Sequence, residues 1–409
     1  MRVFVGIDLG STTTKAVVLD EEERVVGRGI TNSRSNYDVA CAVVREEALV
    51  ATRFALVERF ANGGGGALVE LARNFRLQQH LELNERLREA MLMLAAKRDV
   101  PASVINDICD AMASRTRSGA PRKSDFFRDI AAADYMTLAA EVKGVGFDKL
   151  CAIFDSAILA VENVTLEGAF ERHIIPALAE TEKGFGPLRN AVDRARAVDI
   201  EEVLTIGTGY GRQRLPFPKE QIRSEILCHG LGAHAMFPGT RTVLDIGGQD
   251  TKAIQVDGGG IVTSFQMNDR CAAGCGRYLG YIADEMNLGL HELGPLADES
   301  RQRVKINSTC TVFAGAELRD RLALGQKRED ILAGLHRAII LRAMSLLARS
   351  GGVSDEFTFT GGVARNSAAV RALRDLISEN YGERTLNISP ESIYTGALGA
   401  AIFARRAAA

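Results

Sequence analysis

The feature that most constrains this chain is a short segment that occurs twice. Residues 8–16 and 245–253 align without a gap, and five of the nine positions are identical. The identical residues are Asp8, Gly10, Thr14, Lys15 and Ala16 in the first copy and Asp245, Gly247, Thr251, Lys252 and Ala253 in the second. In each copy a glycine-containing turn lies between strand-like runs, which is typical of a β-hairpin. The repeat predicts an internal duplication, with two lobes that each begin with the same hairpin.

Between the two copies the sequence pattern becomes helical. From about residue 41 to residue 195, apolar residues recur at helical spacing and no site motif is present. We interpret this region as a helical insertion that packs on one lobe and offers a surface for a partner. We therefore expect a first lobe at 1–240 that contains this insertion at 41–195, a second lobe at 241–395, and a C-terminal packing helix at 396–409.

Composition excludes several classes of protein. The chain is 46% hydrophobic and 25% charged, which is ordinary for a globular protein, and its formal net charge of −2 indicates no nucleic-acid binder. No apolar run approaches the roughly 20 residues of a membrane span, and the N-terminus is typical of a strand rather than a signal peptide. Seven cysteines are too few for a disulfide scaffold and odd in number. We expect a reduced, cytoplasmic protein that does not bind a membrane.

The chemistry of the repeated turns suits a phosphate. Glycine lets backbone N–H groups approach a phosphate closely, and hydroxyl or basic side chains add donors. The candidate phosphate-binding residues are Gly10, Ser11, Thr12, Thr13, Lys15, Gly247, Gly248, Asp250 and Lys252. Asp8 and Asp245 supply oxygens for Mg²⁺, which proteins usually hold through water. Ordinary hairpin turns are the alternative, but such turns need neither a run of hydroxyls nor a duplicated acid.

With these two loops the chain resembles the superfamily of acetate and sugar kinases, Hsc70 and actin. The resemblance implies an α/β, ribonuclease H-like ATPase fold of two lobes, with ATP or ADP in the cleft and hinge closure on ATP. Residues 8–14 and 245–251 become the two phosphate loops. A third glycine loop follows the predicted strand 357–360. In the resemblance Gly361, Gly362 and Val363 form the adenosine motif, and Asn366 is a polar neighbour.

Two cysteines are candidate metal ligands. Cys271 and Cys310 each precede a predicted helix, whose dipole favours the thiolate form that binds iron. Spacing alone leaves a buried core role open, and also a zinc site, although no pair of histidines lies near either cysteine. Because two ligands cannot complete a four-cysteine iron–sulfur cluster, a second similar subunit would have to supply the others. We interpret Cys275 as a bystander.

Longer segments strengthen the assignment. The segments 245–252, 267–274, 308–314 and 360–364 are similar to the ATPase family shared by benzoyl-CoA reductase and the activators of 2-hydroxyacyl-CoA dehydratases. The resemblance covers about 1–35 and 196–405. It implies that Cys271 and Cys310, with the same pair from a second subunit, hold one [4Fe–4S] cluster at a two-fold interface. It also implies that ATP hydrolysis drives an electron from this cluster to a partner that reduces a CoA thioester.

The chain departs from the short activators at Cys275, where they carry another residue, and in the helical insertion, which they lack. The insertion favours the larger ATPase subunit of a class I benzoyl-CoA reductase. This implies a smaller homologous ATPase subunit in a pseudo-two-fold dimer, two further subunits with the acyl-CoA site, and ferredoxin as electron donor. Asp8 and Asp245 would then organise Mg²⁺, and Gln249 or Asp250 would position the attacking water.

Three alternatives stay open. The first is an activator of a 2-hydroxyacyl-CoA dehydratase, which would be a homodimer with the same cluster and ATP chemistry. The second is a small-molecule kinase of the same superfamily, which would contain no iron. The third is a regulator that senses ATP without catalysis. The histidines, including His229, are interpreted as packing or surface residues because none has a partner at metal-ligand spacing.

Overall fold

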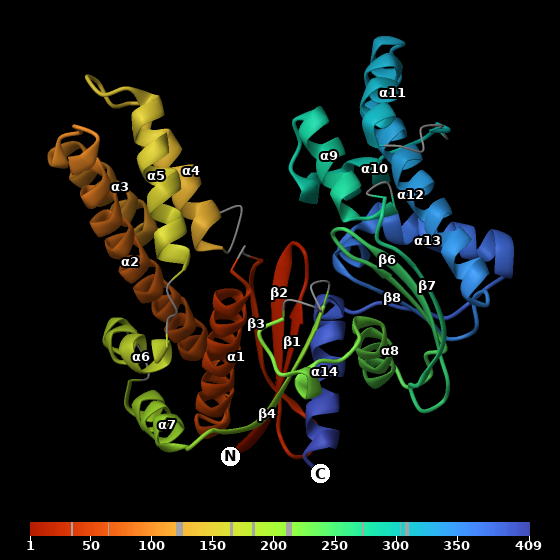
Figure 1. Ribbon diagram of the computed structural model, residues 1–409, viewed down its shortest axis with the longest axis horizontal. Coiled ribbons are helices and arrows are strands. Elements are labelled where there is room, and N and C mark those ends of the chain that lie inside the picture. The colour runs from red at the N-terminus through yellow and green to blue at the C-terminus, as the bar shows by residue number, and fades with distance from the viewer. Residues whose placement is uncertain are drawn as a thin grey trace. The chain divides into compact units, whose positions relative to one another are not determined.

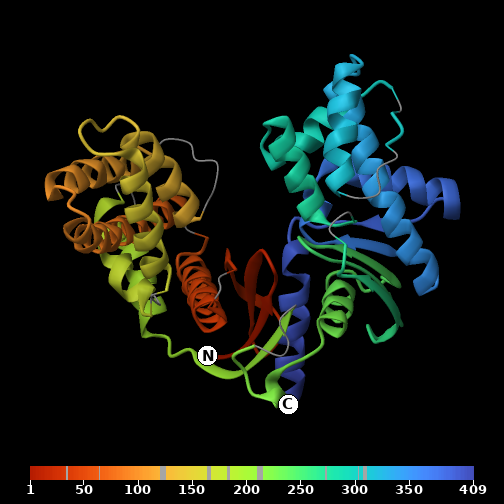
Figure 2. The same cartoon turned by 45° about the horizontal axis from the view of Figure 1, so that its top comes forward.

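The structure is a computed structural model. It describes residues 1–33, 36–63, 65–119, 126–163, 167–181, 185–209, 215–271, 274–302, 304–306 and 311–409. The chain divides into two compact units (Figures 1 and 2). The first unit contains Met1 and residues 26–201, and the second contains residues 2–25 and 202–409. Both repeated hairpins belong to the second unit.

The first unit is mainly helical. It consists of most of β3 (Val25–Asn32) and the helices α1 (Tyr37–Phe60), α2 (Gly65–Lys97), α3 (Ala102–Arg117), α4 (Phe127–Ala139), α5 (Phe147–Glu162), α6 (Ala169–Glu180) and α7 (Phe185–Ala197). Two aromatic clusters mark its two hydrophobic cores. Tyr135 stacks on Phe154 in one, and Phe75 packs against Phe54 and Phe170 in the other. The helices span the region in which the sequence pattern predicts a helical insertion.

The strands form two sheets of related topology. They are β1 (Arg2–Leu9), β2 (Thr13–Leu19) and β4 (Glu201–Gly209), then β5 (Thr242–Ile246), β6 (Thr251–Val256), β7 (Val262–Asn268), β8 (Phe357–Thr360) and β9 (Leu386–Asn387). The first sheet has the order β3-β2-β1-β4 and the second the order β7-β6-β5-β8-β9. In both sheets the hairpin lies between the strand that follows it and a later strand of the chain. The duplication seen in the sequence therefore extends to the strand order.

The two hairpins also pair in the same register. Asp8 lies opposite Lys15 in the antiparallel pair β1–β2, and Asp245 lies opposite Lys252 in the antiparallel pair β5–β6. Residues directly opposite each other in a ladder project from the same face of the sheet. Each hairpin therefore presents one acid and one lysine side by side at the end next to its turn.

The remaining helices belong to the second unit. They are α8 (Glu225–Met236), α9 (Gly276–Met286), α10 (Leu293–Asp298), α11 (Thr311–Ala323), α12 (Arg328–Ser350), α13 (Ser367–Tyr381) and α14 (Thr395–Ala407), with 3-10 turns at Lys219–Gln221, Leu290–Glu292, Gly362–Arg365 and Ser392–Tyr394. Within the described part of the chain, α12 alone is long and apolar enough to cross a membrane, which the sequence pattern did not single out. Its Ile331, Leu335 and Ile339 are buried in the main core of this unit. This burial accounts for the apolar character of α12 as that of a core helix.

The second sheet is covered on both faces. Leu244, Ile246 and Ala253 pack in the core that contains α12, whereas Val243 and Ile254 pack with residues of α8. Because side chains alternate between the faces of a strand, Asp245 projects to the same side as Val243, and Lys252 to the same side as Ile254. The acid and the lysine of the second hairpin therefore project towards α8.

Candidate functional site

Helices α8 and α14 pack side by side and join the two sheets (Figures 1 and 2). α14 contacts β1 and β2, and α8 contacts β5, β6 and β7. The two helices approach closely through glycine, because a Cβ on Gly232 would overlap the carbonyl oxygen of Thr395, and one on Gly399 would overlap that of Cys228. Such close backbone approach leaves the two helices little freedom to slide past each other.

Both hairpin aspartates face this pair of helices. On β1, Gly6 lies against the backbone of α14, and Asp8 projects from the same face two residues later. The Oδ2 atom of Asp8 lies 2.9 Å from the position that a Cβ on Gly396 would occupy. Asp245 faces α8, and both carboxylates are buried, with 5% and 2% of their surfaces exposed. The structure therefore brings together two acids that are 237 positions apart in the chain.

His229 of α8 lies between the two aspartates. Its Nδ1 atom is 3.3 Å from Oδ1 of Asp245, and its Nε2 atom is 4.0 Å from Oδ2 of Asp8. The ring is itself buried. The sequence interpretation makes His229 a packing residue, because neither aspartate is near it in the chain. The position of α8 against both sheets is what brings the histidine to them.

Lys252 is enclosed by acids. Its amine donates to Oδ2 of Asp250 at 2.7 Å and to Oδ2 of Asp245 at 3.2 Å, and Oε1 of Glu225 lies 3.8 Å away. The hydroxyl of Thr360 donates to Oδ1 of Asp245 at 2.8 Å. Lys252 therefore has a structural role in the charge network, and its contact with a phosphate stays a prediction. Glu225 is a further member of the network that sequence reasoning missed.

The network shifts the pKa values of its members. Burial alone would raise the pKa of Asp245 and lower those of His229 and Lys252. The attraction between these opposite charges outweighs burial, so the pKa of Asp245 falls and those of His229 and Lys252 rise. Burial raises the pKa of Glu225. The second hairpin therefore favours a charged arrangement at neutral pH.

Acids outnumber bases in this network. The acids are Asp8, Asp245, Asp250 and Glu225, and the bases are Lys252 and His229. Buried charge of one sign is costly unless it is compensated. A divalent cation that binds carboxylates through water would supply the missing positive charge. The donor set thus fits the predicted Mg²⁺.

The turns of the two hairpins meet. A Cβ on Gly248 would overlap the hydroxyl of Thr12, so the second turn lies against the first. The Nζ atom of Lys15 lies 3.1 Å from the position that a Cβ on Gly10 would occupy, which places this amine over the first turn. Ser11, Thr13, Gly247 and Gln249 are half-buried in the same two turns, and Thr12 is exposed. These residues lie together as the sequence predicts, although their contacts with a nucleotide stay a prediction.

A second pair of equivalent glycines fixes the residues after the aspartates. Gly209 at the end of β4 has a φ of 125°, and a Cβ there would overlap the carbonyl oxygen of Leu9. Gly361 at the end of β8 has a φ of 86°, and a Cβ there would overlap the carbonyl oxygen of Ile246. Both positions require glycine for conformation and for space. Gly209 was not predicted, but the strand order reveals it as the counterpart of Gly361.

The rest of the third glycine loop also has defined roles. Gly362 is exposed and Val363 is buried. The side-chain oxygen of Asn366 accepts a hydrogen bond from Ala369 N at 3.0 Å and so caps α13. Capping uses the amide oxygen, while the predicted contact of Asn366 with adenosine stays a prediction.

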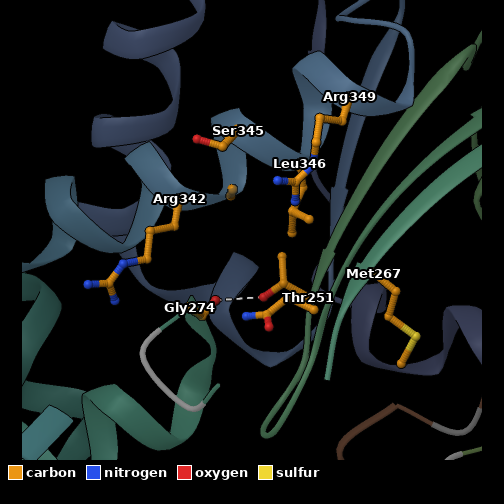
Figure 3. Close-up of a pocket in the computed structure, with 9 residues that line it drawn as sticks. Thr251, Met267, Gly274, Arg342, Ser345, Leu346 and Arg349 are labelled. Carbon is orange, nitrogen blue, oxygen red and sulfur yellow. Dashed lines mark hydrogen bonds between the residues drawn. The ribbon is translucent and has the colours of Figure 1, made fainter. Parts of the chain in front are cut away.

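A cavity of about 270 Å³ lies on the α12 side of the second sheet (Figure 3). It is lined by Thr251, Met267, Asn268, Gly274, Arg342, Ala343, Ser345, Leu346 and Arg349. The hydroxyl of Thr251 donates to Gly274 O at 2.6 Å at its edge. Since Asp245 and Lys252 project to the α8 side, this cavity is separate from the aspartate network.

The predicted cysteine ligands are placed only in part. Cys271 is exposed, and its carbonyl oxygen accepts from Asn268 Nδ2 at 3.2 Å. The sequence pattern places Cys271 at the start of a helix, but α9 begins at Gly276 and the residue that precedes it is Cys275. Burial raises the pKa of the Cys275 thiol, which makes its thiolate less accessible. Cys310 lies outside the described residues.

Helices α9 and α11 run parallel to each other. A Cβ on Gly315 would overlap the hydroxyl of Tyr281, and one turn further along both helices Arg319 donates to Oε2 of Glu285 at 2.6 Å. The two helices therefore begin at the same end of the pair. Cys271 precedes α9, and α11 begins at Thr311. No group of three or more metal-binding side chains occurs among the described residues, a set that does not include Cys310.

The chain matches a family model over nearly its whole length. Residues 5–404 match the BadF/BadG/BcrA/BcrD ATPase family. The chain is 41% identical over 227 residues to the (R)-2-hydroxyglutaryl-CoA dehydratase activating ATPase of Acidaminococcus fermentans, which covers 55% of this chain and 85% of that protein. It is 44% identical over 207 residues to the 2-hydroxyisocaproyl-CoA dehydratase activator of Clostridioides difficile, covering 50% and 74%. Identity to a benzoyl-CoA reductase subunit of Thauera aromatica is 30% over 208 residues, covering 51% and 72%.

Solved structures confirm the fold class predicted from the sequence. The crystal structure of component A of the Acidaminococcus fermentans (R)-2-hydroxyglutaryl-CoA dehydratase aligns with a TM-score of 0.58 and 24% identity, covering 100% of this chain and 99% of that one. The family assignment rests on the longer sequence matches, which include both motif-rich hairpins in residues 5–404. The chain belongs to the BadF/BadG/BcrA/BcrD ATPase family.

Proposed function

We propose that this chain is the ATP-hydrolysing activator of a 2-hydroxyacyl-CoA dehydratase. Three activators are 40–44% identical to it over 207–227 residues, whereas the Thauera aromatica benzoyl-CoA reductase subunit is 30% identical over 208 residues. This difference in identity is the observation that carries the proposal. It reverses the preference of the sequence interpretation, which favours the reductase because of the helical insertion.

The structure supplies a reason to give the insertion less weight. Residues 26–201 form a compact unit with hydrophobic cores of their own. The hairpins, the aspartates and Cys271 all belong to the other unit. A separate unit can be added to a chain without altering the chemistry of the residues outside it. The insertion is therefore compatible with an activator.

In the proposed nucleotide site, Asp8 and Asp245 hold Mg²⁺ through water, and Lys15 contacts a phosphate oxygen. Gly10, Gly247 and Gly248 allow the backbone to approach the phosphates. Bound Mg²⁺ would supply positive charge to a polyphosphate and to this acid-rich network. Among the described residues Lys15 forms no ion pair, which leaves its charge available to an anion. Gln249 positions the attacking water, and Gly361 and Gly362 lie against the adenosine.

The proposed metal centre is a [4Fe–4S] cluster held by Cys271 and Cys310 of two copies of the chain. Exposed Cys271 and the common end of α9 and α11 fit a cluster shared with a second copy. When bound, this group supplies one-electron chemistry. A ferredoxin is the proposed donor, the dehydratase is the proposed acceptor, and the proposed compartment is the cytoplasm.

Backbone hydrogen bonds join the second phosphate loop to α9. The N–H groups of Gly276 and Arg277, in the first turn of α9, donate to the carbonyl oxygens of Gly247 and Gly248 at 2.8 and 2.7 Å. A movement of this loop on ATP binding or hydrolysis would therefore pull on the helix that follows Cys271. This link is the proposed route by which nucleotide state reaches the metal centre.

The test is anaerobic purification followed by two assays. We expect iron and acid-labile sulfide in the dimer, and ATP-dependent activation of a 2-hydroxyacyl-CoA dehydratase when a reduced ferredoxin is supplied. Copurification with a shorter homologous ATPase and two iron–sulfur subunits, with ATP-dependent benzoyl-CoA reduction, would instead establish the reductase. ATP-dependent phosphorylation of a sugar or carboxylate by iron-free protein would establish the kinase.

Cysteine variants test the ligands. Cys271→Ser or Cys310→Ser should remove most of the iron while ADP binding is retained. Cys151→Ser, in the helical unit, is the matched control and should retain the full iron content. Full iron content in both ligand variants would show that the ligand assignment is wrong.

A further inference from the structure

His229 occupies a position between the equivalent acids of a duplicated hairpin. One ring nitrogen faces Asp245 at 3.3 Å, and the other faces Asp8 at 4.0 Å. Like charges that are buried near each other repel strongly. A histidine between them can offset that repulsion and set the spacing of the two carboxylates.

The surroundings hold the ring in place. A Cβ on Gly396 would lie 2.8 Å from Nε2 of His229 and 2.9 Å from Oδ2 of Asp8, so the absence of a side chain there makes room for both. The close contacts of Gly232 and Gly399 fix α8 against α14 on either side of this point. His229 is therefore anchored by the same helix pair that joins the two sheets.

We propose that His229 is a positioning residue that holds Asp8 and Asp245 at the spacing needed for both to act on one nucleotide-bound cation. This inference rests on the proposed nucleotide site and adds a residue to it. His229 does not contact the reacting phosphate in this proposal. It acts through the two carboxylates, and through them it couples the two halves of the duplicated fold.

The first test is His229→Gln in the full-length chain. We expect the rate of ATP hydrolysis to fall about 10–100-fold, the usual loss when a residue that orients a metal ligand is removed. Binding of ADP without metal, measured by calorimetry, should change less than about threefold, while more Mg²⁺ is needed for half-maximal hydrolysis. An unchanged rate and Mg²⁺ requirement would overturn the proposal.

His234→Gln is the matched control. His234 lies further along α8, where its ring packs against Gly260 rather than against an aspartate. We expect its hydrolysis rate and Mg²⁺ requirement to equal those of the unaltered protein. An equal loss in both variants would mean that any change in α8 impairs the enzyme, and would overturn a specific role for His229.

A second test needs neither the His229 variant nor a nucleotide. If His229 couples the acids, the effects of Asp8→Asn and Asp245→Asn on the thermal midpoint of unfolding should not add in the double variant. Additive shifts would overturn the inference even if His229→Gln fails to fold. If the unaltered protein hydrolyses no ATP, the proposed function fails, but this nucleotide-free test still decides the coupling.

Discussion

The two hairpins have the same register and different charge environments. Lys15 and Lys252 occupy equivalent positions opposite equivalent aspartates. Lys252 is buried among three acids, whereas Lys15 is half-buried and, within the described part of the chain, without an ion pair. The position equivalent to Asp250 is Thr13 in the first hairpin, so that an acid present in one turn is absent from the other. The duplicated backbone thus carries one structural lysine and one that is available to a ligand.

The largest expected effect is that of Lys252→Met on stability. Removing this amine leaves three buried acids with less compensation, and breaking a buried ion pair typically costs about 3–5 kcal/mol. Lys15→Met is the matched control, with an expected loss of less than about 1 kcal/mol because its side chain is partly exposed. Urea unfolding of the nucleotide-free protein measures both. Equal losses would contradict the distinction between the two lysines.

The glycines that follow β4 and β8 test the similarity of the two halves. Gly209→Ala and Gly361→Ala should each destabilise the protein by about 2–4 kcal/mol, because alanine disfavours a positive φ and its Cβ would overlap a carbonyl oxygen. Gly362→Ala, where no atom lies near the added Cβ, should cost less than about 1 kcal/mol. A large loss at only one of the two equivalent glycines would break the comparison.

A buried histidine outside the hairpins tests whether charged neighbours, rather than burial, decide protonation. His336 of α12 donates from Nδ1 to Leu332 O at 2.7 Å, and burial lowers its pKa to about 4, whereas acids raise the pKa of His229. A histidine that is harder to protonate when folded stabilises the protein above about pH 6.5. This stability, up to about 3 kcal/mol, is lost as the pH falls towards 4.

The measurement is the free energy of unfolding between pH 7 and pH 4 for the unaltered protein and for His336→Leu. Subtracting one curve from the other removes the contribution of the remaining titrating groups. We expect the variant to lose less stability than the unaltered protein over this range. Parallel curves would show that His336 is protonated as readily in the folded state as in the unfolded state.

The smallest effect concerns binding. Lys15→Met should weaken ATP binding about 10–100-fold, since a hydrogen bond to a charged group contributes roughly 1.5–3 kcal/mol. Calorimetric titration with a non-hydrolysable ATP analogue measures this change. Arg342→Met, at the cavity on the opposite face of the sheet, is the control and should leave affinity unchanged. Unchanged affinity in Lys15→Met would remove this lysine from the proposed site.

Much of the fold followed from local patterns in the sequence. The repeat from Asp8 and from Asp245 predicted two hairpins, and helical spacing predicted the region that α1 to α7 occupy. These features depend on residues near each other in the chain, whose spacing is visible in the sequence. The motifs around the second hairpin and the cysteines also predicted the family, which the family match confirms.

The tertiary structure alone decided which distant groups meet. His229 and Glu225 reach the hairpin acids only because α8 packs on the sheet beside α14, and no local spacing records that contact. The burial of Lys252, the helix-start position of Cys275 and the role of Gly209 have the same origin. Sequence periodicity determined the elements and their faces, whereas the packing of elements far apart in the chain determined the charge of the site, because burial and opposite charges act through space.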